Sequence, residues 1–337
     1  MLPPSSRFKF TSDLEICRLL NGMWQVSGAH GYIEPERGVS EMFRYHEAGF
    51  TTWDLADHYG PAEDFIAMFR SRFATQYGRQ RLAEIQAFTK WVPHPGPMTR
   101  SIVERAVDIS LKRMGVGSLD LLQFHWWDYQ DERYLDALGH LADLQREGRI
   151  KHLAMTNFDT QRLRTIAERG IPIVSNQVQY SIVDRRPASQ MSEFCQQRGI
   201  TLLSYGAVLG GLLSERHLGR PEPRRDELNT ASLQKYKRMI DVWGGWGLFQ
   251  ELLAQLKRIA ERYQVSIANI GVRYVLESPA VAGVIVGARL GLSEHIADNQ
   301  RVFNFALDAN DYAQIEAVQA KSRDLMTAIG DCGDEYR

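Results

Sequence analysis

The sequence predicts an α/β fold of the (β/α)8 TIM-barrel class, in which eight parallel strands close into a cylinder surrounded by helices. Two features lead to this prediction. Amphipathic helical segments alternate with short apolar strands along the chain, and a glycine separates many helices from the strand that follows. Polar residues also recur where the strands end. A closed parallel sheet would bring those residues to one rim, and in such barrels that rim holds the active site.

Glycine marks the end of five predicted helices. Each of these glycines stands between a helical segment and an apolar run: Gly49, Gly115, Gly148, Gly170 and Gly199. Glycine adopts the left-handed C-cap conformation without a side-chain penalty, so five such junctions indicate consecutive βα units. We expect strands at about residues 18–24, 50–54, 84–90, 119–125, 150–156, 173–178, 200–205 and 282–286.

Two smaller elements accompany these strands. Residues 8–10 and 14–17, separated by Thr11-Ser12-Asp13, are typical of a hairpin ahead of the first strand, and it could cover the bottom of the barrel. Thr99 is a candidate N-cap for the helix that ends before Gly115.

The stretch from about 207 to 247 interrupts the rhythm of strands and helices. It contains prolines, paired arginines and the glycine-tryptophan run 243–247, and the next helix is expected near Leu248. We interpret it as a long loop after the seventh strand, because insertions of this size on a catalytic rim usually form a lid or a substrate wall. A C-terminal helix and tail should occupy about 309–337, and the whole chain, 1–337, is expected to form one domain.

Composition narrows the functional classes. Lys and Arg number 40 against 41 Asp and Glu, which leaves no basic surplus for nucleic acid as the main partner. No apolar stretch is long enough to span a membrane. Three widely spaced cysteines, Cys17, Cys195 and Cys332, suit neither a disulfide framework nor a metal site. We therefore expect a reduced, soluble, cytoplasmic protein without a bound metal.

Several well-known site motifs are absent. The chain has neither the glycine-rich fingerprint of a Rossmann fold nor a P-loop. The first strand runs into Gly22-Met23-Trp24-Gln25 instead of a His-x-His pair, so a metal-dependent barrel hydrolase is a remote alternative.

Seven short segments, in order, carry a family resemblance. They are Trp53–Gly60, Phe88–Lys90, Gln123–Trp126, Thr156–Phe158, Asn176–Tyr180, Ser204–Gly206 with Gly211–Leu213, and Gly287–Arg289 with Asp298-Asn299. Each resembles a motif of the aldo-keto reductases, and together they extend over about residues 14–325. Any one of these motifs is weak evidence, but seven in sequence are strong evidence. The resemblance implies a barrel oxidoreductase that uses a nicotinamide dinucleotide.

By this resemblance, Asp54, Tyr59, Lys90 and His125 would be catalytic. The chemistry is consistent with these roles. A phenol can donate a proton to a carbonyl oxygen, but its ordinary pKa is about 10. An ammonium about 4 Å away would favour the phenolate by roughly 4 kcal/mol at an effective dielectric of 20. We therefore expect Lys90 to lower the pKa of Tyr59, Asp54 to keep Lys90 charged, and His125 to orient the carbonyl. The alternative is that Asp54 and Lys90 form a purely structural ion pair and that Tyr59 and His125 are polar residues of the core.

The same resemblance implies cofactor contacts along the rim. Thr156, Asn157 and Gln177 would bind the nicotinamide amide, and the ring of Tyr205 would stack on the nicotinamide, although a core tyrosine is the alternative. The remaining expected cofactor contacts are Met23, Trp24, Gln25, Gly206, Val208, Gly211, Gly287, Arg289, His295, Asp298 and Asn299. Arg289 suits a 2′-phosphate, whereas His295 is only partly charged at neutral pH. We therefore expect NADPH, with NADH as the alternative.

The chain departs from the family pattern at Arg289 and His295 and also at two positions of the other motifs. Thr156 replaces a serine but keeps the hydroxyl, and Leu55 replaces a threonine. Trp24, Trp91 and Trp126 are candidate substrate contacts, although core packing explains Trp91 equally well. An aromatic pocket of this kind admits sugars, quinones, aryl aldehydes and pyridoxal alike.

Two functions remain open from the sequence. The first is an NAD(P)(H)-dependent oxidoreductase that interconverts a small carbonyl compound and an alcohol. The second is a regulatory subunit that senses the cofactor on the same barrel. The complete set of four catalytic candidates favours the enzyme.

Overall fold

Eight parallel strands close into a barrel in the computed structural model, which describes residues 2–28 and 32–336. The strands are β3 (Leu19–Gly22), β4 (Thr52–Asp54), β5 (Gln86–Trp91), β6 (Leu119–His125), β7 (Ile150–Thr156), β8 (Ser175–Gln179), β9 (Thr201–Tyr205) and β10 (Val281–Gly287). Neighbours follow the chain order, and β10 closes the cylinder by pairing with β3 and β9. The predicted (β/α)8 barrel is confirmed, with each strand within a few residues of its expected place.

The strand register aligns the polar strand ends. Asp54 pairs with Gly22, His125 pairs with Thr156, and Thr156 pairs in turn with Gln177. Because the strands are parallel, their carboxyl ends lie on one rim of the cylinder. The register therefore assembles the candidate site from residues that are far apart in the sequence.

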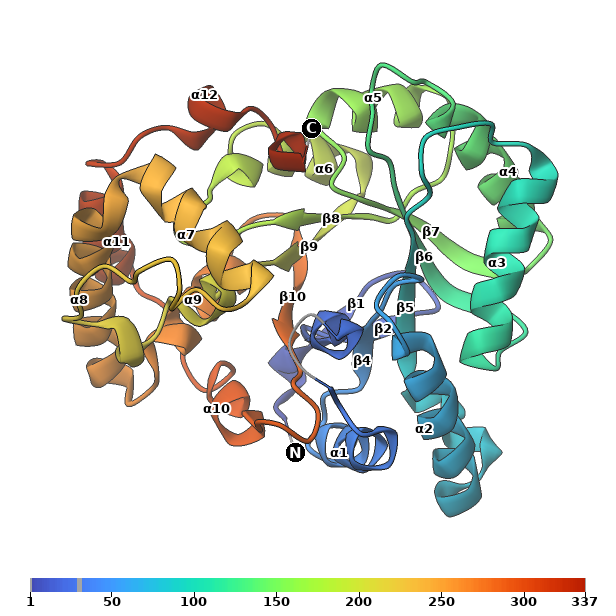
Figure 1. Cartoon of the computed structure of the whole chain (residues 1–337), viewed down its shortest axis with the longest axis horizontal. Coiled ribbons are helices and arrows are strands. Elements are labelled where there is room, and N and C mark those ends of the chain that lie inside the picture. Colours follow the sequence, from blue (N-terminus) through green and yellow to red (C-terminus); the bar gives the residue numbers. More distant parts are fainter. Residues whose placement is uncertain (1, 29–31, 337) are drawn as a thin grey trace.

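Helices surround the barrel (Figure 1). One group covers β4 to β9: α1 (Pro35–Glu47), α2 (Ala62–Tyr77), α3 (Arg100–Met114), α4 (Tyr134–Arg146), α5 (Thr160–Glu168) and α6 (Met191–Arg198). The other group lies on the opposite side: α7 (Ala231–Trp243), α8 (Gly245–Tyr263), α9 (Ile267–Leu276), α10 (Ile296–Arg301) and α11 (Ala309–Gln319). In the described part of the chain, no helix combines the length and apolar character that a bilayer crossing needs.

The glycine junctions and the start of α3 lie where the sequence predicts them. All five glycines have positive φ, from 65° at Gly115 to 100° at Gly49, so each ends its helix in a conformation that favours glycine. Thr99 does occupy the N-cap position of α3. Its hydroxyl, however, lies 3.2 Å from the Ser101 hydroxyl and makes no capping bond to the backbone. The predicted N-cap residue is therefore confirmed, although its side chain makes no hydrogen bond to the backbone.

The N-terminal hairpin covers one end of the barrel. Strands β1 (Arg7–Lys9) and β2 (Glu15–Cys17) pair antiparallel, with Phe8 opposite Ile16. Phe10 and Ile16 pack against a separate cluster inside the cylinder formed by Leu20, Phe88, Leu121, Ala154, Leu203 and Ala282. The strand ends that form the candidate site lie at the other end, so the hairpin seals the barrel without entering the site.

Removing the hairpin's contact with the barrel interior should destabilise the fold. Phe10 is 7% exposed, and Phe10→Ala should lower the free energy of unfolding by about 3–4 kcal/mol because it leaves a cavity in a closed core. Phe8→Ala is the matched control, since Phe8 is only partly buried. Urea denaturation of both variants measures the difference, and equal losses would show that the interior packing of Phe10 is unimportant.

The segment from 207 to 247 is more ordered than a loop. It contains two single-turn helices, η5 (Leu209–Gly211) and η6 (Glu215–His217), and then the helix α7. Thr230 caps α7 by accepting a hydrogen bond from the amide of Leu233 at 3.2 Å. The helix α8 begins at Gly245, three residues before the expected position near Leu248. The sequence interpretation missed α7 because the run of glycines and tryptophans at 243–247 resembles a loop.

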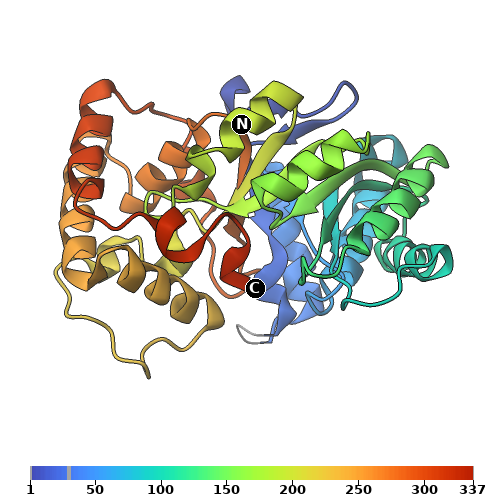
Figure 2. The ribbon, with the colours of Figure 1, turned by 90° about the horizontal axis from the view of Figure 1, so that it is seen from above.

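The chain returns to the barrel at its C-terminal end. After α11 come α12 (Leu325–Ile329) and a single-turn helix, η7 (Asp334–Tyr336). Figure 2 shows this segment running from the outer helices to the middle of the molecule, where it ends close to the strands. The predicted C-terminal helix is therefore followed by a tail that lies over the catalytic rim.

Candidate active site

A cavity of about 350 Å³ lies at the carboxyl ends of the barrel strands. Most of the predicted site residues line it: Trp24, Gln25, Asp54, Tyr59, Lys90, His125, Thr156, Asn157, Gln177, Tyr205, Gly206, Val208 and Gly287. The structure also brings in Trp127, which the sequence left open between an aromatic pocket and core packing, and four residues that the sequence did not indicate: His58, Lys235, Tyr236 and Tyr336. Lys235 and Tyr236 come from α7, and Tyr336 comes from the tail.

A buried ion pair forms the base of the cavity. The Nζ atom of Lys90 lies 2.6 Å from the carboxylate of Asp54 and 2.8 Å from the carbonyl oxygen of Leu55. Both charged side chains are only 2–3% exposed. The other carboxylate oxygen of Asp54 accepts hydrogen bonds from Gln123 at 2.9 Å and Gln177 at 2.7 Å. Burial lowers the pKa of Lys90, and the adjacent carboxylate opposes that effect.

Tyr59 stands over this ion pair as a neutral phenol. The Nζ atom of Lys90 lies 4.9 Å from the centre of the Tyr59 ring. Burial, followed by the negative charge of Asp54, raises the pKa of Tyr59 well above 10. The expectation that Lys90 lowers this pKa is therefore wrong. The ammonium is already neutralised by Asp54, and that carboxylate repels a phenolate, so Tyr59 keeps its proton at neutral pH.

Arg113 of α3 holds the loop that carries Tyr59. Its guanidinium donates to the carbonyl oxygens of Asp57 at 2.9 Å and Gly60 at 2.6 Å, on either side of the tyrosine. It also pairs at 3.3 Å with Glu63, whose side chain is fully buried. Glu63 in turn accepts from Thr89, the neighbour of Lys90, at 2.6 Å. This contact could not be predicted from the sequence, because α3 reaches the loop only through the barrel topology.

The ring of His125 is fixed by the backbone of the next strand. Its Nδ1 atom lies 3.0 Å from the carbonyl oxygen of Thr156, and because a carbonyl can only accept, Nδ1 carries a proton. In the neutral ring Nε2 is therefore an acceptor, and it donates only when the ring is doubly protonated. Trp127 packs edge-on against this ring, with ring centres 4.4 Å apart.

Polar groups without partners mark one side of the cavity. The buried hydroxyl of Thr156 and the buried side-chain oxygen of Gln25 have no hydrogen-bond partner among the described residues. Asn157 accepts from the hydroxyl of Tyr205 at 2.8 Å. The amide nitrogen of Gln177 donates to both Asp54 and Gln123, so only its oxygen remains to meet an incoming donor. Buried polar groups of this kind are typical of a site that a polar ligand completes.

Eight of the predicted site residues lie outside this cavity: Met23, Gly211, Trp91, Trp126, Arg289, His295, Asp298 and Asn299. Met23 is fully buried, and Gly211 lies beyond the lining residues. Trp91 packs on Phe124 with ring centres 5.4 Å apart, and the fully buried Trp126 donates its indole N–H to the backbone carbonyl oxygen of Asp128 at 2.7 Å.

Strand alternation explains the two tryptophans. Lys90 and His125 face the cavity, so the residues that follow them point the other way. The structure therefore does not support Trp91 and Trp126 as substrate contacts. It agrees instead with core packing for Trp91, and it places Trp127 at the cavity.

The predicted adenosine contacts lie on the segment after β10. His295 is the N-cap residue of α10, and Asp298 and Asn299 belong to that helix. The carboxylate of Asp298 accepts from the Ser266 hydroxyl at 2.9 Å and from the side-chain amide of Asn269 at 3.3 Å. Asp298 thus joins α10 to the start of α9. The cofactor roles of Arg289, His295, Asp298 and Asn299 stay predictions.

No group of three or more His, Cys, Asp or Glu side chains is arranged to hold a metal ion within residues 2–28 and 32–336. The chemistry of the cavity therefore centres on a buried ion pair, a protonated phenol, an imidazole and a set of amide and hydroxyl groups.

The class of the protein follows from its match to a known family. The sequence matches the model of the Aldo/keto reductase family over residues 18–320, and the chain belongs to that family.

Curated relatives match most of the chain at low identity. The L-glyceraldehyde 3-phosphate reductase of Escherichia coli K12 is 23% identical over 92% of this chain and 91% of its own length. The NADH-specific methylglyoxal reductase of the same organism is 22% identical over 93% and 98%. A flagellar radial spoke protein of Chlamydomonas reinhardtii is 28% identical but matches only 48% of this chain and 34% of its own length.

Solved structures share the fold. The glycerol dehydrogenase of Gluconobacter oxydans has a TM-score of 0.77 with 18% identity, covering 98% of both chains. An aldo/keto reductase of Klebsiella pneumoniae in complex with NADP and acetate has a TM-score of 0.69 with 17% identity, covering 93% of this chain and 95% of its own. At these identities the similarity supports the barrel architecture alone.

Proposed function

We propose that the protein is an NADPH-dependent oxidoreductase that interconverts an aldehyde or ketone and the corresponding alcohol, with Tyr59 as the general acid. One observation carries this proposal. The buried Asp54–Lys90 pair, the protonated phenol of Tyr59 and the ring of His125 all border a single cavity. A carbonyl oxygen that gains charge during reduction needs hydrogen-bond donors and a proton, and these residues can supply both.

The cavity has the groups that a nicotinamide ring would need. Its carboxamide offers one acceptor and two donor hydrogens, which would match the unpaired Thr156 hydroxyl, the Gln25 oxygen and the free oxygen of Gln177. The ring of Tyr205 provides a flat surface beside them. A reduced dinucleotide bound there would supply the hydride. The NADP named in the Klebsiella structure is consistent with this cofactor.

The choice of NADPH over NADH rests on charge. Arg289 would meet a 2′-phosphate, and His295, Asp298 and Asn299 would complete the adenosine contacts. The NADH-specific methylglyoxal reductase among the relatives keeps NADH as the alternative. We further propose that the barrel, the insertion and the tail form one domain that works on small carbonyl compounds in the cytoplasm.

Each catalytic side chain then has a defined task. Tyr59 gives its proton to the carbonyl oxygen, and the Asp54–Lys90 pair beneath it keeps that phenol oriented and neutral until the transfer. As the phenolate forms, the Lys90 ammonium, whose Nζ lies 4.9 Å from the centre of the Tyr59 ring, would offset part of its charge. His125 donates to the same oxygen only in its doubly protonated form, because Nδ1 is already engaged by Thr156.

The ionisation of Tyr59 can be measured directly. Because burial and Asp54 raise its pKa, the phenol should stay protonated up to and beyond pH 10. The difference in 295 nm absorbance between the wild type and Tyr59→Phe should therefore show no phenolate below pH 10. A phenolate signal near neutral pH would mean that Lys90 dominates after all and would contradict the electrostatics described above.

Binding and turnover together test the function. NADPH and NADH should each be titrated by quenching of tryptophan emission, and a panel of carbonyl compounds should be assayed by loss of NADPH absorbance at 340 nm. We expect NADPH to bind more tightly than NADH and at least one aldehyde to be reduced. Binding without turnover on any carbonyl would instead favour the cofactor-sensing role.

A further inference from the structure

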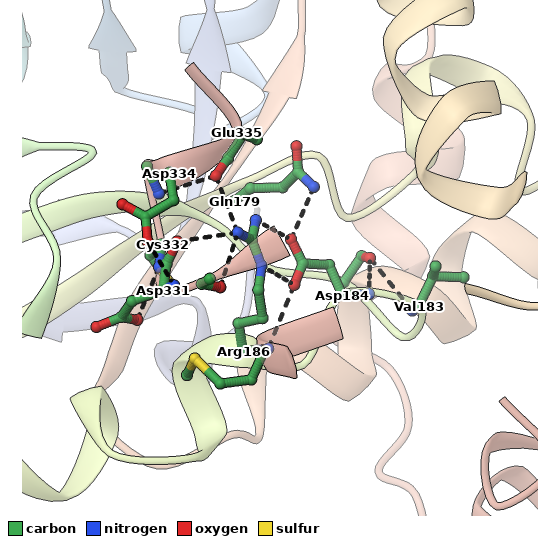
Figure 3. A network of polar contacts seen from close by, with 12 residues as sticks. Gln179, Val183, Asp184, Arg186, Asp331, Cys332, Asp334 and Glu335 are labelled. Atoms are coloured by element: carbon green, nitrogen blue, oxygen red, sulfur yellow. Dashed lines mark hydrogen bonds and ion pairs between the residues drawn. The ribbon is translucent and has the colours of Figure 1, made fainter. Parts of the chain in front are cut away.

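The C-terminal tail is held in place by one buried arginine. Arg186, whose side chain is 1% exposed, donates to both carboxylate oxygens of Asp184 at 2.9 and 2.8 Å. It also donates to the carboxylate of Glu335 and to the carbonyl oxygen of Asp331, both at 3.0 Å (Figure 3). Two carboxylates on one guanidinium raise the pKa of Arg186, so it stays charged and the tail stays anchored.

Further hydrogen bonds fix both ends of this anchor. Gln179, the last residue of β8, donates to Asp184 at 2.7 Å. The carboxylate of Asp331 accepts from the backbone N–H of Thr160, the first residue of α5, at 2.8 Å. Figure 3 shows the tail residues gathered on one side of Arg186, and Gln179, Val183 and Asp184 on the other. The tail is therefore tied to two of the loops that form the catalytic rim.

This anchoring places Tyr336 in the cavity. Its hydroxyl lies 3.0 Å from the hydroxyl of Tyr205, and Lys235 of α7 donates a hydrogen bond to the Tyr336 oxygen. Three aromatic rings surround the Lys235 ammonium, with centres 4.9 Å (Tyr205), 5.4 Å (Tyr236) and 4.4 Å (Tyr336) from Nζ. The C-terminal tail, strand β9 and the insertion therefore meet at the Lys235 ammonium.

Lys235 differs from Lys90 in its charged neighbours. Among the residues that the structure describes, no carboxylate forms an ion pair with Lys235, whereas Lys90 is paired with Asp54. Aromatic faces stabilise an ammonium but leave its charge in place. An ammonium has three donor hydrogens, and Tyr336 takes one, so two can point into the cavity. Carboxylate and phosphate oxygens are the strongest partners for such donors.

We propose that Lys235, held against Tyr336 by the anchored tail, is a specificity-determining residue that selects carbonyl substrates bearing a carboxylate or a phosphate. This inference rests on the proposed reductase function and names the substrate class for the same site. The dinucleotide also carries phosphate groups, so the experiments must separate an acidic substrate from the cofactor.

Matched substrate pairs test the inference. Glyceraldehyde 3-phosphate is compared with glyceraldehyde, and succinic semialdehyde with butanal, by kcat/KM. The wild type should prefer the acidic member of each pair, and Lys235→Met should reduce that ratio roughly 10- to 100-fold. Lys235→Arg should keep the preference because it keeps the charge. Wild-type turnover of both members at the same rate would overturn the inference.

The same variants show whether Lys235 binds the cofactor instead of the substrate. The affinity for NADPH, measured by tryptophan quenching, should change far less in Lys235→Met than the substrate ratio does. If the NADPH affinity falls while the substrate ratio is retained, Lys235 serves the cofactor's phosphates and the inference is wrong. Glu335→Gln tests the anchor, because a loosened tail should lower the acidic preference through Tyr336 without removing the ammonium.

A binding readout keeps the test independent of turnover. Succinate and inorganic phosphate should raise the melting temperature of the wild type but not that of Lys235→Met. This result would support the anion site even if no carbonyl in the panel were reduced, in which case only the reductase function would fail. Equal stabilisation of both proteins would place the anions elsewhere and contradict the inference.

Discussion

Tyr59→Phe is expected to lower kcat for carbonyl reduction by roughly 10²- to 10⁴-fold, the usual contribution of a positioned general acid. The change removes only the hydroxyl, so the aromatic packing on Trp24, with ring centres 5.0 Å apart, should remain. Cofactor affinity should therefore be nearly unchanged. The test is the rate of NADPH oxidation at saturating aldehyde, together with an NADPH titration.

A matched loss of a phenolic hydroxyl outside the site provides the control. Tyr32 is 78% exposed, and Tyr32→Phe should react at the wild-type rate. If Tyr59→Phe also keeps the wild-type rate, Tyr59 is not the acid and the proposed mechanism is wrong.

Lys90→Met should have the largest effect on stability. It leaves the carboxylate of Asp54 buried without its ammonium, and breaking a buried ion pair in this way costs about 3–5 kcal/mol of unfolding free energy. Turnover should fall as well, because the Lys90 ammonium would no longer offset the charge of the phenolate. Urea denaturation measures the stability, and the 340 nm assay measures the turnover.

Two further variants separate the charge effect from packing. The double variant Asp54→Asn with Lys90→Met should recover part of the lost stability, because it removes the unpaired charge. Lys151→Met breaks a pair with Asp120 in which the lysine is 51% exposed, and it should cost less than about 1 kcal/mol. Equal losses from Lys90→Met and Lys151→Met would show that burial of the Asp54–Lys90 pair does not matter.

The barrel and its catalytic rim could be predicted because their signals are local. A glycine after a helix and a polar residue at a strand end can each be recognised from a few neighbouring residues in the sequence. Closure of a parallel sheet then brings the strand ends to one rim. The helix α7 was missed because the run at 243–247 obscured its end. The tail contacts were out of reach for another reason. Arg186 and Glu335 are 149 positions apart, and only the completed fold brings them together.

Two errors at the site have physical causes. The tryptophan assignments ignored strand alternation, which turns Trp91 and Trp126 away from the side that Lys90 and His125 face. The pKa predicted for Tyr59 includes Asp54 only as the partner that keeps Lys90 charged, and it omits burial and the repulsion between the Asp54 carboxylate and a phenolate. The sequence indicates which charged groups come together at the site. Their combined effect on the pKa of Tyr59 depends on distances and burial that only the structure provides.

Transfer of deuterium from the cofactor tests the central claim most directly. NADPH labelled with deuterium at the reactive carbon of the nicotinamide should be incubated with the protein and an aldehyde, and the alcohol analysed by mass spectrometry and NMR. Hydride transfer in this cavity predicts one deuterium on the carbinol carbon for one isomer of labelled NADPH and none for the other. An alcohol without deuterium from either isomer, or no oxidation of NADPH with any carbonyl, would contradict the account.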